Sequence, residues 1–134
     1  MNKINLACVI DDDDIYTFSV KRIIAKAEIA HHTIFFHNGR AAMDYLSENL
    51  KDHTQLPDLI LLDLNMPVLD GWQFMDEFAT IVPHTNKKIK VYIVSSSIDE
   101  EDYQRAKEIE LISDFVVKPL TVNHLQDILS QLVA

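Results

Sequence analysis

The chain has 134 residues, enough for one domain, and its 48% hydrophobic and 25% charged residues are typical of a folded protein with a packed core. Its formal net charge of −9 argues against a nucleic-acid partner, because binding to a phosphate backbone depends on an excess of Lys and Arg. No apolar run approaches the roughly 18 residues of a membrane span, and the single cysteine, Cys8, excludes an intrachain disulfide. We therefore expect a cytoplasmic protein that binds neither membrane nor nucleic acid.

Glycine content excludes several common nucleotide and hydrolase sites. The only glycines are Gly39 and Gly71. The three-glycine dinucleotide fingerprint is impossible with two, and their separation fits neither a P-loop nor a G-x-S-x-G nucleophile elbow.

Five short apolar runs predict strands at residues 6–10, 33–36, 59–62, 91–94 and 115–117. Each run precedes a segment with apolar residues at helical spacing, and the fourth helix is expected to begin near Asp99. The stretch 47–55 reads as a frayed helix end and a loop. The apolar stripes of the other four helices are Val20, Ile23, Ile24 and Ala27; Ala42, Tyr45 and Leu46, after a break at Gly39; Met75, Phe78, Ala79 and Val82; and Leu125, Ile128, Leu129 and Leu132.

Strict alternation of strand and helix predicts an α/β fold. The parallel strands need right-handed crossovers, so we expect a doubly wound, flavodoxin-like sheet of five strands in the order 2-1-3-4-5, with helices on both faces. Ligands of such sheets bind at the carboxyl ends of the strands, where the strand order reverses. That point lies between the first and third strands.

Carboxylates follow both of these strands. The first runs into Asp11, Asp12, Asp13 and Asp14, and the third ends at Asp63. A run of aspartates before a helix is also typical of a solvated helix cap. Three carboxylates at one edge, however, repel each other by on the order of 4 kcal/mol per close pair, which calls for a cation or a raised pKa. Oxygen ligands on an open edge suit Mg²⁺.

The fourth and fifth strands also end in polar residues. Ser95, Ser96 and Ser97 follow the fourth and could donate hydrogen bonds to a phosphoryl oxygen, although serines after a strand are commonly turn residues. The fifth ends at Lys118, before Pro119, and its ammonium could neutralise a transferring phosphoryl group.

The chain resembles the receiver domain of two-component response regulators, including stand-alone chemotaxis regulators, over essentially all of its length. We therefore expect residues 1–134 to form a single receiver domain. The segments that carry the resemblance are Val9-Ile10-Asp11-Asp12-Asp13, Leu61-Leu62-Asp63-Leu64-Asn65-Met66-Pro67 with Asp70-Gly71, Ile93-Val94-Ser95-Ser96, and Phe115-Val116-Val117-Lys118-Pro119.

The resemblance implies a role for each matching residue. Asp63 would be the phosphoacceptor, and Mg²⁺ would be held by Asp12, Asp63 and the backbone carbonyl of Asn65, with Asp11 in support. We assign Asp11 and Asp12 rather than Asp12 and Asp13 because the first two directly follow the strand. Phosphate contacts would come from Lys118, Ser95 and Ser96, the switch residues would be Ser95 and Phe115, and the peptide between Lys118 and Pro119 would be cis.

The implied function is that of a phosphoacceptor in a two-component phosphorelay. It would receive a phosphoryl group from a sensor histidine kinase or a histidine phosphotransfer protein and would take part in its own slow dephosphorylation without being an enzyme. The signal would leave through the face formed by the fourth helix, fifth strand and fifth helix. Because the chain ends at that helix, we expect a separate downstream effector, with the protein acting as a monomer or a phosphorylation-linked dimer.

Other functions are compatible with parts of this pattern. The protein could be a relay carrier, a phosphate sink or an interaction module that works without phosphorylation. A Mg²⁺-dependent aspartyl phosphatase is disfavoured, because its two aspartates are one residue apart and Asp63 is followed at that spacing by Asn65. We expect Cys8 to be buried and Trp72 to lie partly exposed near the site. The histidines have no metal-ligand spacing and are expected at the surface: His31, His32, His37, His53, His84 and His124.

Overall fold

The computed structural model describes residues 3–96 and 98–133, which form one five-stranded sheet and five α-helices. No helix in these two ranges is long and apolar enough to cross a membrane. The strands are β1 (Ile4–Ile10), β2 (Ala30–Phe36), β3 (Leu59–Leu62), β4 (Lys90–Ser95) and β5 (Ile112–Val117). The helices are α1 (Asp14–Ala27), α2 (Gly39–Glu48), α3 (Gly71–Ile81), α4 (Glu100–Glu108) and α5 (Val122–Val133), with a 3-10 turn, η1 (Val82–His84), after α3.

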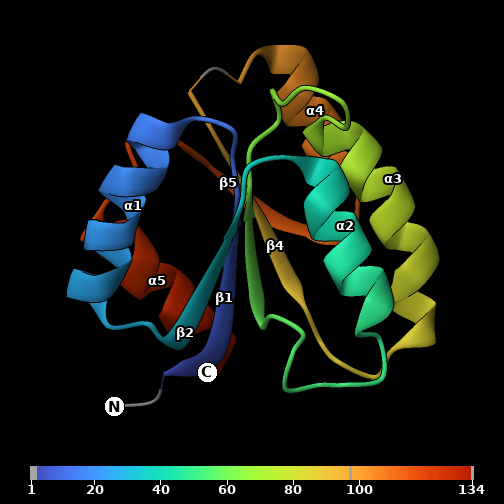
Figure 1. Ribbon diagram of the computed structural model, residues 1–134. Helices are drawn as coiled ribbons and strands as arrows, with labels where there is room; N and C mark the ends of the chain where they lie inside the picture. The colour runs from blue at the N-terminus through green and yellow to red at the C-terminus, as the bar shows by residue number, and fades with distance from the viewer. Residues whose placement is uncertain (1–2, 97, 134) are drawn as a thin grey trace.

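All neighbouring strands are parallel, and their order is β2-β1-β3-β4-β5, which confirms the predicted topology. In Figure 1, α1 and α5 lie on one side of the sheet and α2, α3 and α4 on the other. The carboxyl ends of the strands therefore meet at one edge, from which the loops lead into the helices.

Each face of the sheet has its own apolar core. The core under α1 and α5 is built on Val9, Leu61 and Val94, whereas the core under α2, α3 and α4 is built on Ile10 and Leu62. Side chains alternate between the faces along each strand, and both faces are covered, so β3 is buried throughout. This explains why β3 reads as an uninterrupted apolar run. Cys8 is also buried, as predicted.

Side-chain caps fix where the helices begin. Asp13 accepts hydrogen bonds from the backbone of Ile15 and Tyr16 at the start of α1. Asp70 forms a capping box with Gln73 at the start of α3, with the reciprocal bonds at 2.8 and 2.9 Å. These caps fix the ends of the loops that lead from the carboxyl edge of the sheet into α1 and α3.

The structure corrects several details of the sequence prediction. Gly39 does not break the chain but is the first residue of α2, which is capped by Asn38. Ala79 is exposed rather than part of the buried stripe of α3. This helix ends at Ile81 because Pro83 has no amide hydrogen with which to continue it.

Candidate functional site

Two aspartates directly follow adjacent strands, at the same level of the carboxyl edge. Ile10 of β1 is paired with Leu62 of β3, so Asp11 and Asp63 follow the two strands side by side. The amide of Asp63 donates to the carbonyl oxygen of Ile10 at 3.0 Å. Ser95 is one position further along β4, and its carbonyl oxygen accepts from the amide of Lys118 at 2.9 Å.

Carboxylate oxygens of Asp11, Asp12 and Asp63 lie within 4.8 Å of one another. Asp11 and Asp63 are buried, whereas Asp12 is exposed. Asp13 is engaged as the cap of α1 and is not one of the three. The cluster therefore contains two shielded carboxylates and one that is open to solvent.

Lys118 supplies positive charge to this cluster. Its Nζ donates to Asp11 Oδ2 at 2.8 Å, and Asp11 Oδ1 accepts the amide of Asp13 at 2.9 Å. The side chain of Lys118 is only 15% exposed, so the ion pair is largely shielded from water. The peptide bond from Lys118 to Pro119 is cis.

Burial raises the pKa of Asp63 from 3.8 to about 6, and the nearby carboxylate of Asp11 adds to this effect. Lys118 and hydrogen bonds from the backbone of Asn65 and Leu64 act in the opposite direction. Additional positive charge, from either a metal ion or a bound proton, would therefore stabilise the Asp63 side chain in this environment.

A close backbone approach holds the segment that follows Asp63. A Cβ atom on Gly71 would lie 2.7 Å from the carbonyl oxygen of Asp63 and 2.8 Å from the Cα of Leu64. The amide of Gly71 donates to the carbonyl oxygen of Leu64 at 3.0 Å. Only glycine leaves room for α3 to start against the loop that follows Asp63.

The remaining predicted residues have different environments. Ser95 is fully buried at the end of β4, whereas Ser96 and Asn65 are exposed in loops. The Phe115 ring is half-buried and packs edge-on against Tyr103 of α4, with ring centroids 4.4 Å apart. The predicted role of Ser97 falls outside the described residues.

Sequence reasoning missed Tyr16, in the first turn of α1. The Nζ atom of Lys118 lies 3.9 Å from the centre of the Tyr16 ring. The Tyr16 hydroxyl is buried without a hydrogen-bond partner in the described ranges, and burial with the charges of Asp11 and Asp63 raises its pKa. The available signal was its place five residues after Asp11, at the start of the helix that leaves the acidic edge.

The predicted environments of Trp72 and the histidines are mostly correct. Trp72 is half-buried at the start of α3, and the guanidinium of Arg105 in α4 stacks on it at 4.6 Å. Five of the six histidines are exposed. The exception is His124, which is half-buried near the start of α5 and whose Nδ1 accepts a hydrogen bond from the amide of Thr121.

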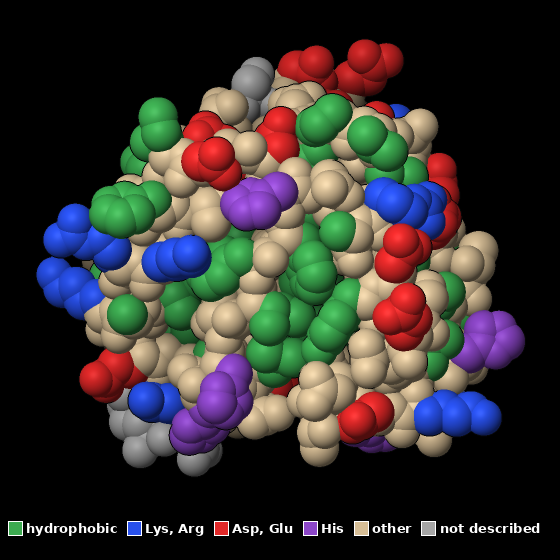
Figure 2. Space-filling model, viewed as in Figure 1, with side chains coloured by type: hydrophobic (Ala, Val, Ile, Leu, Met, Phe, Trp, Pro, Cys, Tyr) green, Lys and Arg blue, Asp and Glu red, His purple; other side chains and the backbone are tan. Residues whose placement is uncertain are grey.

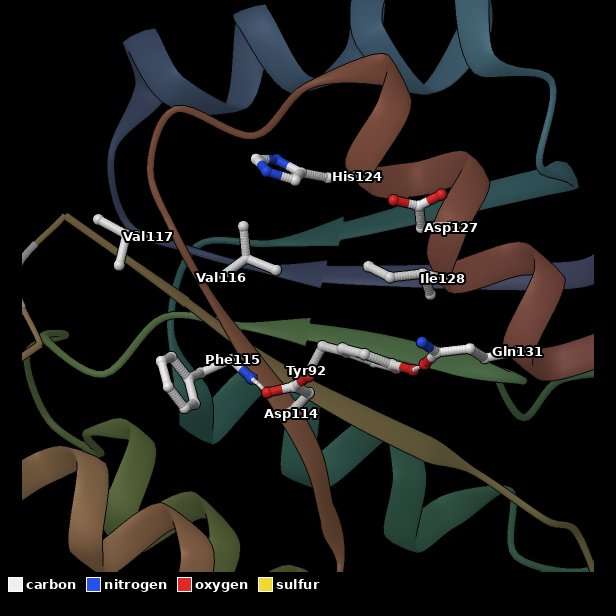
Figure 3. A pocket seen from close by; sticks show the side chains of 9 residues that line it. All are labelled: Tyr92, Asp114, Phe115, Val116, Val117, His124, Asp127, Ile128 and Gln131. Carbon is white, nitrogen blue, oxygen red and sulfur yellow. Dashed lines mark hydrogen bonds between the residues drawn. The ribbon is translucent and has the colours of Figure 1, made fainter.

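A separate groove lies between β5 and α5. Figure 3 shows its lining, with Phe115 and Val117 from the strand and His124 and Gln131 from the helix. The Tyr92 hydroxyl donates to Gln131 at 2.7 Å across its floor. None of the clustered aspartates lines this groove.

Residues 7–130 match the family model of the response regulator receiver domain. The chain belongs to this receiver family. A two-component response regulator from Cytophaga hutchinsonii, known as a crystal structure, is 32% identical, with a TM-score of 0.88 over 98% of each chain. Response regulator Rcp1 from Synechocystis is 28% identical over 104 residues, covering 77% of this chain and 69% of Rcp1. The Mn²⁺-bound structure of Rcp1 matches with 25% identity and a TM-score of 0.73 over 95% of this chain and 90% of that chain.

Proposed function

We propose that this receiver accepts a phosphoryl group from a phosphohistidine onto Asp63. The observation that carries the proposal is the buried Asp63 carboxylate grouped with Asp11 and Asp12, beside the Lys118 ammonium. An Asp63 oxygen would bond to phosphorus while the phosphorus–nitrogen bond of the donor breaks, and the histidine ring would keep the electron pair of that bond. This transfer depends on positioning and charge neutralisation more than on acid–base chemistry.

The donor set fits Mg²⁺, because Asp11, Asp12 and Asp63 offer only oxygen ligands. The backbone carbonyl of Asn65 would add a fourth oxygen. When bound, the ion would neutralise the carboxylates and the oxygens of the incoming phosphoryl group. The Mn²⁺-bound structure of Rcp1 supports a divalent ion in this family. Within the protein, Lys118 would contact the transferred group, and Ser95 and Ser96 would offer hydroxyl donors.

Exposed apolar residues next to the acidic edge support a protein as the phosphoryl donor. Ile15 is 84% and Phe18 65% exposed on α1, close to the aspartates that precede this helix. Figure 2 shows hydrophobic side chains beside acidic ones on this part of the surface. A sensor histidine kinase or a histidine phosphotransfer protein would dock here. We expect Ile15→Ser with Phe18→Ser to slow transfer from the protein donor but not labelling by acetyl phosphate; equal slowing of both would contradict this docking site.

The signal would leave through α4, β5 and α5. The negative charge and acceptor oxygens on modified Asp63 would draw the Ser95 hydroxyl toward them, and Phe115 would repack. The contact between Phe115 and Tyr103 supports a route from the site to α4. We expect Ser95→Ala to be labelled but to lose the NMR shift changes in residues 100–117 that accompany labelling. Unaltered shift changes in this variant would overturn the coupling.

Labelling with acetyl phosphate and Mg²⁺, followed by intact-protein mass spectrometry, tests the phosphoacceptor proposal. We expect one phosphoryl adduct that needs Mg²⁺ and is absent in Asp63→Asn. Asp76→Asn is the matched control, because Asp76 is an exposed carboxylate on α3. An adduct that persists in Asp63→Asn, or none in the native chain with either acetyl phosphate or a phosphorylated histidine kinase, would overturn the proposal and favour an interaction module that works without phosphorylation.

A further inference from the structure

The ammonium of Lys118 has two close partners. One partner is Asp11 Oδ2 at 2.8 Å, and the other is the ring of Tyr16, whose centre is 3.9 Å away. Asp11 follows β1 and Tyr16 lies in the first turn of α1, whereas Lys118 follows β5. The amide of Tyr16 donates to Asp13 Oδ1 at 3.1 Å, so the cap of α1 fixes the backbone that carries the ring.

The Tyr16 hydroxyl does not explain why this side chain lies here. Its oxygen is buried, and no residue in 3–96 or 98–133 forms a hydrogen bond with it. A buried hydroxyl without a partner is destabilising. The favourable contacts of Tyr16 are therefore made by its ring, which packs at the margin of the core under α1 and faces Lys118.

An aromatic face differs from a further carboxylate in one important respect. It attracts a cation through its quadrupole but carries no net charge. An ammonium has three N–H donors, of which one is directed to Asp11. A carboxylate in place of Tyr16 would compete with an incoming phosphoryl group for Lys118, whereas the ring restricts the ammonium and leaves its charge available.

We propose that Tyr16 is a positioning residue that holds the Lys118 ammonium at the phosphoacceptor edge through its ring face. This inference rests on the proposed function, since Lys118 is assigned there to the transferred phosphoryl group. The ring acts through Lys118 and does not itself touch the reacting atoms. Loss of a partly buried cation–π contact corresponds to roughly a five- to tenfold decrease in the rate of phosphoryl transfer.

The test compares Tyr16→Leu, which removes the ring, with Tyr16→Phe, which removes only the hydroxyl. The rate of labelling by acetyl phosphate and Mg²⁺ is measured for both variants, alone and combined with Lys118→Met. We expect Tyr16→Leu to be about five- to tenfold slower and Tyr16→Phe to stay within about twofold of the native chain. In the Lys118→Met background, Tyr16→Leu should cause no further loss.

NMR supplies a readout that is independent of labelling. The ring current of Tyr16 should shift the side-chain methylene resonances of Lys118 upfield in the native chain and in Tyr16→Phe, but not in Tyr16→Leu. The amide spectrum of each variant also reports whether it is folded. If Lys118 shows no ring-current shift in the native chain, the contact is absent in solution and the inference is wrong.

The labelling outcomes separate this inference from the function on which it rests. If the native chain is labelled and Tyr16→Leu keeps the native rate, the positioning role is wrong and the phosphoacceptor proposal stands. If Tyr16→Phe is as slow as Tyr16→Leu, the hydroxyl acts instead of the ring, and the inference is again wrong. If the native chain accepts no phosphoryl group from any donor, both fail.

Discussion

Lys118 Nζ donates to Asp11 Oδ2 at 2.8 Å, although the two residues are 107 positions apart in the chain. This ion pair joins the loop after β5 to the end of β1, on opposite sides of β3 and β4 in the sheet. It also brings positive charge to Asp63, whose pKa Lys118 lowers. Lys118 therefore links two distant strand ends and also places positive charge next to the carboxylate cluster.

Replacing this lysine should destabilise the protein. Lys118→Met leaves the buried carboxylate of Asp11 without its cation, and breaking a shielded ion pair in this way costs about 3 kcal/mol. We expect a loss of that size in the free energy of unfolding, measured by urea denaturation at pH 7 in EDTA. Lys88→Met, at an exposed loop position, is the control and should change little. Equal stability of the two variants would contradict a structural role for the pair.

The raised pKa of Asp63 predicts a pH dependence of stability in the absence of divalent ions. Its pKa is 3.8 when unperturbed and about 6 in the folded chain, so the folded state binds more protons between these values. The stability contributed by the protonated carboxyl is present below about pH 4 and is lost as the pH rises through about 6. Asp63→Asn should therefore be more stable than the native chain above pH 7, by about 2 kcal/mol after allowance for solvent screening.

Urea denaturation of both proteins from pH 4 to pH 8 measures this difference. The difference in the free energy of unfolding between Asp63→Asn and the native chain should grow with pH. A difference that is constant across this range would show that the pKa of Asp63 is not raised by folding.

Mg²⁺ should stabilise the folded chain. An ion that binds only the folded state at about 100 times its Kd raises the free energy of unfolding by about 2.7 kcal/mol. We expect thermal unfolding to shift upward with Mg²⁺, and the shift to be lost in Asp12→Asn and Asp63→Asn but kept in Asp76→Asn. Trp72 fluorescence, from the start of α3, offers a second signal. An equal Mg²⁺ response in all three variants would place the ion elsewhere.

Gly71 should be needed for both stability and phosphoryl acceptance. In Gly71→Ala, the new Cβ would meet the backbone of Asp63 and Leu64 at under 3 Å, so the loop must move at a cost of about 1–3 kcal/mol. Gly39→Ala is the matched control, because its Cβ would lie 2.6 Å from the carbonyl oxygen of Leu69 rather than against Asp63. We expect both variants to be destabilised but only Gly71→Ala to be labelled more slowly when folded. Equal labelling rates would contradict the role given to Gly71.

The predictability of the fold from sequence follows from burial. The bounds of β3 were predicted correctly because both of its faces are covered and every residue is apolar. The edge strands β2 and β5 begin three residues before the predicted segments. The first halves of these strands contain polar residues, such as His31, His32 and Asp114, which are exposed and give no apolar signal.

The convergence of the candidate site was also predictable, because parallel strands bring their carboxyl ends to one edge. The four consecutive aspartates are chemically identical, so sequence alone could not show that Asp13 is taken up by the cap of α1. The stacking of Lys118 on Tyr16 could not be predicted either. It depends on the packing of α1 against the loop after β5, which no local pattern encodes.

Chemical mapping of the acceptor tests the central claim most directly. The chain is labelled with acetyl phosphate and Mg²⁺, reduced with borohydride, which converts an aspartyl phosphate to homoserine, and digested for peptide mass spectrometry. We expect homoserine at position 63 and unmodified Asp11, Asp12 and Asp13. Homoserine at one of these three aspartates, or a labelled protein with intact Asp63, would contradict it.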